Sequence, residues 1–161
     1  MIAFDLLSLT STVMIAMSLL IIAVALLQAL ILFKRQQRLQ LRAHTHQVIK
    51  EDLIWPRRIL SILREIKGRD ISPIFMQDSE LRQDLREALD YCENISLGIR
   101  HGVYDEETIR DSYAKLFVVL YAQVERLIHE LRYESNDPET YGAFTAIVKK
   151  WQYDSKYGRK L

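Results

Sequence analysis

Residues 13–33 read VMIAMSLLIIAVALLQALILF, and they decide the architecture of this 161-residue chain. The stretch contains no charged residue, and only Ser18 and Gln28 are polar. A helix of this length spans roughly 30 Å, at about 1.5 Å per residue, which matches the hydrocarbon core of a bilayer. A helix buried in a soluble core would be shorter and would carry a polar stripe. The stretch therefore predicts a transmembrane helix.

A cleaved signal peptide is the alternative explanation of the same stretch. Signal peptides begin with a basic segment and end at a small-residue cleavage site. Here no Lys or Arg precedes Lys34, and the apolar run, too long for a signal peptide, ends in Leu32, Phe33, Lys34 and Arg35. We therefore expect the helix to remain as an uncleaved anchor in the lipid bilayer.

Charge around the apolar stretch predicts its orientation. Residues 34–50 contain five basic residues and no acidic one, and the N-terminal flank contains no basic residue. The positive-inside rule then places the N-terminus outside and the C-terminal domain in the cytoplasm. A single cysteine, Cys92, fits that reducing compartment. Four basic residues next to the bilayer are candidate contacts for lipid head groups: Lys34, Arg35, Arg38 and Arg42.

The remaining charge is divided between two regions. Residues 34–70 contain 10 basic and 4 acidic residues, whereas residues 71–161 contain 12 basic and 16 acidic residues. Positive charge next to the membrane and negative charge away from it suits a domain on an anionic leaflet. A nucleic-acid surface would need a basic patch away from the lipid, so no nucleic-acid partner is predicted.

Apolar periodicity after residue 33 predicts an all-α fold. Gly and Pro are scarce and fall between periodic segments, and no segment alternates as a strand does. We expect a first helix from 34 to about 55 that Pro56 breaks or kinks, and a second from 56 to 67 with Ile59, Leu60, Leu63 and Ile66 on one face. The domains expected are a flank (1–12), a transmembrane helix (13–33), a basic helical stalk (34–68), a small antiparallel helical bundle (69–152) and a tail (153–161).

Three further helices are expected within the bundle. The first is capped by Asp78 or Ser79 and carries a seam at heptad-like spacing, namely Leu81, Leu85, Ala88, Cys92, Ile95 and Ile99. The second is capped by Asp105. The third is expected to begin with Asp137 as its cap and Pro138 as its first residue.

A polar cluster at the end of the seam helix is the candidate site for a ligand or a partner. Its residues are Glu93, Asn94, Leu97, Gly98, Arg100, Gly102 and Asp105. Glu93 and Arg100 share a helical face over two turns, and the two glycines let another backbone approach closely. The alternative interpretation is a helix hairpin whose charges lock the turn.

No residue pattern predicts catalysis, a cofactor or a metal. The Walker, dinucleotide-binding and nucleophile-elbow motifs are missing from the sequence. His44 and His46 point about 200° apart on a helix, which does not suit metal binding. Cys92 lies on the apolar seam and is expected to be a small core residue rather than a reactive thiol. No catalytic residue is predicted, and the small molecule that the cluster would bind, if any, is not specified by the sequence.

The segment Tyr91–Glu107, YCENISLGIRHGVYDEE, resembles the central signature of a bacterial and phage-associated family, domain of unknown function family 4760. The similarity covers about residues 50–152, with Tyr141 and Trp151 also fitting the pattern. The resemblance implies a helical domain behind an N-terminal membrane helix, and it implies a role in phage defence or exclusion. It implies no chemistry.

These features predict a single-pass bacterial inner-membrane protein whose cytoplasmic helical domain binds a protein partner or assembles a membrane complex. The partner is another protein or, in a homo-oligomer, further copies of this chain. The alternative is a membrane-anchored effector with ribonuclease-like activity. That alternative rests on Arg38 and His44, whose spacing occurs in some helical ribonucleases, and on His129. It is the weaker interpretation because Arg38 and His44 lie in a basic flank that the membrane topology already explains.

Overall fold

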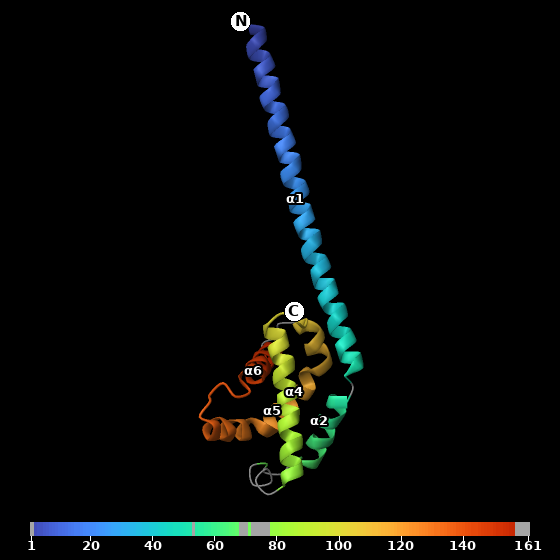
Figure 1. The fold of residues 1–161 in the computed structure, drawn as a ribbon, viewed down its shortest axis with the longest axis vertical. Helices are drawn as coiled ribbons and strands as arrows, with labels where there is room; N and C mark the ends of the chain where they lie inside the picture. The colour runs from blue at the N-terminus through green and yellow to red at the C-terminus, as the bar shows by residue number, and fades with distance from the viewer. Residues whose placement is uncertain (1, 53, 68–70, 72–77, 157–161) are drawn as a thin grey trace. The chain divides into compact units, whose positions relative to one another are not determined.

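The computed structural model describes residues 2–52, 54–67, 71 and 78–156, with side chains from Met14 onward except those of residues 15 and 16. Its elements are all helical and are named here as in Figure 1: α1 (Ile2–Glu51), α2 (Ile54–Glu65), α4 (Ser79–Arg100), α5 (Glu106–Ser135) and α6 (Gly142–Lys156). The predicted all-α class is confirmed. The chain divides into two compact units, residues 1–40 and residues 41–161, and we call the second the packed unit.

α1 is one helix through the apolar stretch and the basic flank. From Met17 onward it is long and apolar enough to cross a membrane, and none of its most apolar window is buried within the chain. The large apolar side chains from Met17 to Phe33 are each 47–66% exposed. The chain therefore has one N-terminal apolar helix of the kind found in membrane anchors and signal sequences.

The break between α1 and α2 lies before Pro56 rather than at it. α1 ends at Glu51, and Pro56 falls within the first turn of α2, where a missing N–H leaves no hydrogen bond unmade. Ile59, Ile62 and Ile66 are buried, whereas Leu60 is 46% exposed. The predicted apolar face was wrong in including Leu60 and omitting Ile62.

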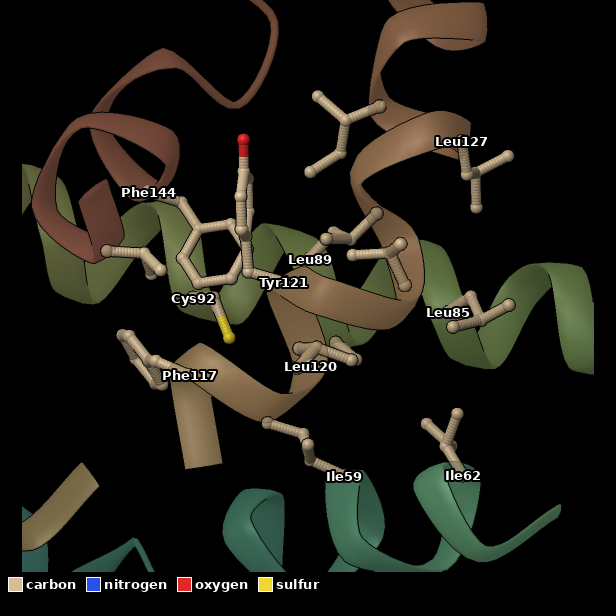
Figure 2. Packing of buried hydrophobic residues seen from close by; sticks show 14 of the residues in the cluster. Ile59, Ile62, Leu85, Leu89, Cys92, Phe117, Leu120, Tyr121, Leu127 and Phe144 are labelled. Atoms are coloured by element: carbon tan, nitrogen blue, oxygen red, sulfur yellow. The ribbon is translucent and has the colours of Figure 1, made fainter. Parts of the chain in front are cut away.

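The core of the packed unit is formed by α2, α4, α5 and α6. Helices α2 and α6 each pack against both α4 and α5, and Figure 2 shows side chains from all four helices meeting. The predicted seam on α4 is confirmed, since five of its six residues are buried and Ile99 is half-buried. The predicted stalk includes α2, and in the structure α2 packs against α4 and α5 and contributes buried residues to the core. Residues 72–77 of the predicted bundle and residues 157–161 of the predicted tail lie outside the described residues.

Two of the three predicted N-caps are confirmed. Asp78 caps α4 by accepting hydrogen bonds from the N–H groups of Glu80 and Leu81, and Asp105 caps α5. The third prediction was wrong, because α6 begins at Gly142 rather than at Pro138.

The chain turns between α5 and α6 instead of starting a helix at Asp137. The Asp137 carboxylate accepts hydrogen bonds from the Glu139 N–H (2.9 Å) and the Thr140 hydroxyl (3.1 Å), which stabilises a turn. Asn136 and Tyr141 have positive φ angles of 51° and 55°, and these left-handed residues reverse the chain on either side of the turn.

Candidate functional site

Glu93, the first acidic residue of the predicted cluster, caps α6 from a neighbouring helix. Its carboxylate accepts hydrogen bonds from the Ala143 N–H (3.1 Å) and the Phe144 N–H (2.7 Å). These N–H groups in the first turn of α6 have no partner within their own helix, and the helix dipole favours a negative charge there. The side chain of Glu93 is thus directed at α6, and no ion pair joins it to Arg100 among the described residues.

Asp105 joins the start of α5 to the end of α1. Its carboxylate accepts hydrogen bonds from the Thr108 N–H (2.9 Å) and hydroxyl (2.8 Å), and its own N–H donates to the Thr45 hydroxyl (2.9 Å). Arg42 forms ion pairs with Asp105 (3.4 Å) and with Glu107. Burial alone would raise the pKa of Asp105, but the hydrogen bonds from Thr108 and the Arg42 charge lower the pKa below its usual value.

The basic residues expected at the lipid surface therefore differ in their surroundings. Arg42 contacts α5 through the two carboxylates at its N-terminus. Lys34, Arg35 and Arg38 are exposed on α1.

The two glycines of the predicted cluster serve the connection between α4 and α5. A Cβ on Gly98 would lie 2.3 Å from the ring of Tyr104, so the ring covers the helix at the point where a side chain is missing. The Tyr104 ring also stacks with His44, with 6.2 Å between the centroids. Gly102 has a φ of 70°, which favours glycine, at the end of α4.

Replacing Gly98 with alanine should destabilise the packed unit by about 1 kcal/mol, because overpacking outweighs the better helix propensity of alanine. Cys92 provides the measurement, since it is the only cysteine and is 0% exposed. Pulse labelling of its thiol at increasing urea concentration reports opening of the core. In the Tyr104→Ala background, where the ring is missing, Gly98→Ala should no longer lower the free energy of unfolding. A more stable Gly98→Ala single variant would contradict the contact.

A shallow groove lies between α4 and α6 and has a volume of about 350 Å³. We call it the α4–α6 groove. Its lining is Ser96, Ile99 and Arg100 from α4, Glu106 from α5, and Ala143, Ala146, Ile147 and Lys150 from α6. Of the predicted cluster only Arg100 lines this groove. Asn94 and Gly102 are exposed outside it, and Leu97 is half-buried.

Charges at one end of the groove are unequally neutralised. Lys150 pairs with Glu106 (2.7 Å), which also accepts a hydrogen bond from the Trp151 indole N–H (3.1 Å). Arg100 is exposed and has no hydrogen-bond or ion-pair partner in the part of the chain that the structure describes. The groove therefore offers an apolar floor beside one unneutralised guanidinium.

Cys92 and Tyr91, neighbours on α4, take part in packing between the helices. Cys92 is fully buried, as predicted for a core residue, and burial raises the pKa of its thiol. Tyr91 on α4 stacks with Trp55 on α2, with 5.6 Å between the ring centroids. The guanidinium of Arg58, also on α2, lies over the Trp55 ring, 5.2 Å from its centroid, and pairs with Asp84 and Glu87 on α4. These contacts hold α2 against α4.

The described residues contain no group of three or more His, Cys, Asp or Glu side chains that could hold a metal ion. Of the two histidines named for ribonuclease chemistry, His44 lies on α1 and its ring stacks with that of Tyr104, whereas His129 lies on α5.

An apolar N-terminal helix followed by a packed helical unit defines a class of small all-α proteins with a candidate membrane anchor. The chain matches the family described as "Domain of unknown function (DUF4760)" over residues 14–151, and it belongs to that family. The predicted resemblance is confirmed, and the match extends further toward the N-terminus than expected, into the apolar stretch. Comparison with curated proteins and with solved structures gives no match.

Proposed function

We propose that this chain is a single-pass inner-membrane protein whose cytoplasmic helical unit holds a protein partner at the membrane. The observation that carries the proposal is the exposure of the apolar helix on every face. A helix that is apolar all round needs an apolar environment, and none of its most apolar window is buried against the rest of the chain. A lipid bilayer supplies that environment.

Two further observations support an anchor rather than a cleaved signal peptide. The family match includes residues 14–33 together with the packed unit, as expected when both parts work as one protein. α1 also continues through the basic flank, and Arg42 and Thr45, in its part within the packed unit, bond Asp105. The last part of the same helix, from Leu41 onward, therefore belongs to the packed unit.

The packed unit supports binding rather than catalysis. The carboxylates of Glu93, Asp105 and Glu106 bond groups within the bundle, which leaves them little capacity to act on a substrate. The α4–α6 groove, by contrast, presents apolar side chains to solvent beside a cation. Apolar surface flanked by charge is typical of protein-binding sites.

Topology labelling and native mass spectrometry test the proposal. We expect a membrane-impermeant maleimide to label Asp5→Cys in intact spheroplasts and to label Gln123→Cys only after permeabilisation. Wild-type protein is the control, because its only thiol is buried. Native mass spectrometry of the gently extracted full chain should then show a second polypeptide at fixed stoichiometry, with residues 1–33 retained.

Other results would change the conclusion in separate ways. A chain lacking its first residues and released from the membrane would identify a signal peptide and refute the anchor. A correctly inserted monomer without a second polypeptide would refute partner binding. A pure homo-oligomer would replace the partner with further copies of this chain.

A further inference from the structure

We infer that the α4–α6 groove binds an acidic amphipathic helix of the partner, with a carboxylate of that helix on Arg100. The inference rests on the proposed function and specifies which segment of the partner is recognised. The occupant is a cytoplasmic protein, and a second copy of this chain or lipid in the groove would be the other outcomes of the test.

The shape of the groove suits a helix. On α6 the lining residues Ala143, Ala146, Ile147 and Lys150 follow a spacing of three, four and seven residues, so they form one stripe along the helix. Ser96 and Ile99 lie opposite on α4. Alanine and serine are small enough to let another helix backbone come close, while Ile99 and Ile147 supply apolar contact.

The floor of the groove is apolar in effect, although Ser96 contributes to it. The Ser96 hydroxyl donates a hydrogen bond to the Cys92 carbonyl (2.7 Å) within α4, and Ser96 is 2% exposed. The Ser96 hydroxyl already has a hydrogen-bond partner within the helix and needs none from an occupant of the groove. An occupant that covers this floor is therefore recognised there by apolar side chains.

Charge at one end of the groove specifies the rest of the occupant. Arg100 and Lys150 are both exposed at this end, and Glu106 neutralises only Lys150. An apolar occupant that covered Arg100 would remove its hydration without replacing it. A carboxylate on the occupant restores that interaction with a charge-assisted hydrogen bond, for which a planar guanidinium is well suited.

The order of these features along the groove fixes the pattern expected in the partner. Glu93 bonds the first turn of α6, and Arg100, two turns further along α4, lines the same groove as Lys150, two turns along α6. The apolar floor therefore lies between the Glu93 cap and the basic end. The partner helix should present small and apolar residues on one stripe, with Asp or Glu at one end of it.

Site-specific photocrosslinking in native membranes tests this inference on the full-length protein. A photoreactive phenylalanine replaces Ala146, which is exposed in the groove, and in a matched variant it replaces Ala122, which is exposed on α5 outside the groove. We expect a crosslink from position 146, mapped by mass spectrometry to a helical segment that contains an acidic residue beside apolar ones. We expect no such crosslink from position 122.

Charge reversal tests the role of Arg100. Arg100→Glu should reduce the crosslink yield by about tenfold or more, since like charges then face each other. Lys149→Glu is the matched control, because Lys149 is exposed on α6 but does not line the groove. Changing the crosslinked carboxylate of the partner to Lys should restore the yield with Arg100→Glu.

The outcomes separate this inference from the function on which it rests. If a second polypeptide co-purifies but crosslinks from position 122 and not from 146, the groove assignment is overturned while partner binding stands. A crosslink from 146 to another copy of this chain, to lipid, or to a segment without an acidic residue also overturns it. If no second polypeptide is found at all, both the function and the groove assignment fail.

Discussion

Replacing Phe117 with alanine should lower the free energy of unfolding of the packed unit by about 3–5 kcal/mol. Phe117 is 0% exposed at the centre of an aromatic cluster. Its ring lies 5.4 Å from the Phe144 ring, 5.9 Å from Trp151 and 6.1 Å from Tyr113, measured between centroids. The cluster joins α5 to α6, so truncation leaves a cavity that neither helix can fill without moving. A loss of this size is a large part of the stability of a small domain, about 5–15 kcal/mol.

Pulse labelling of Cys92 in urea, on the full chain in detergent, measures this loss. Val119→Ala is the control on the same helix, because Val119 is 43% exposed and its truncation should change stability by about 0.5 kcal/mol or less. Phe117→Leu keeps most of the volume and should fall between the two. Equal effects of Phe117→Ala and Val119→Ala would contradict the packing.

Local features of the fold were predictable from the sequence because they depend on neighbouring residues. The seam on α4 follows from apolar spacing within one helix, and the caps at Asp78 and Asp105 bond N–H groups two or three residues away. The face of α2 was less predictable, because Leu60 and Ile62 are both apolar. Which of them is buried depends on where α4 and α5 lie, and periodicity in a short helix does not determine that.

The start of α6 shows how a distant residue overrides a local signal. Asp137–Pro138 has the composition of a helix start, but Asp137 stabilises a turn instead. The cap of α6 comes from Glu93, 50 residues before Ala143 in the sequence. A local sequence pattern does not predict a contact between residues so far apart.

The same limit applies to the candidate site. Arg100 was predicted because it lies in the polar cluster at the end of α4. The α6 side of the groove was missed, although the spacing of Ala143, Ala146, Ile147 and Lys150 was a readable signal, because small residues at helical spacing do not reveal which helix lies opposite.

Replacing Glu93 with leucine should destabilise the packed unit by about 2–4 kcal/mol, because two hydrogen bonds to a charged group disappear and two N–H groups in the first turn of α6 lose their partner. Glu93→Gln keeps one acceptor oxygen but places an amide donor against a donor, so we expect about half of that loss. Hydrogen exchange of the Ala143 and Phe144 amides should accelerate in both variants, and thiol labelling of Cys92 gives the global stability.

The pattern of effects distinguishes a cap from a binding residue. Glu134→Gln is the matched control, since Glu134 is exposed on α5, and it should leave both measurements unchanged. If Glu93 acted mainly on a partner, Glu93→Gln would lose crosslinking from position 146 while amide exchange in α6 stayed at the wild-type rate. The two hydrogen bonds to α6 predict the opposite pattern in Glu93→Gln: amide exchange of Ala143 and Phe144 accelerates. The crosslink from position 146 then weakens only to the extent that the displaced first turn of α6 changes the shape of the groove. Unchanged exchange at Ala143 and Phe144 in the leucine variant would show that this carboxylate does not hold α6.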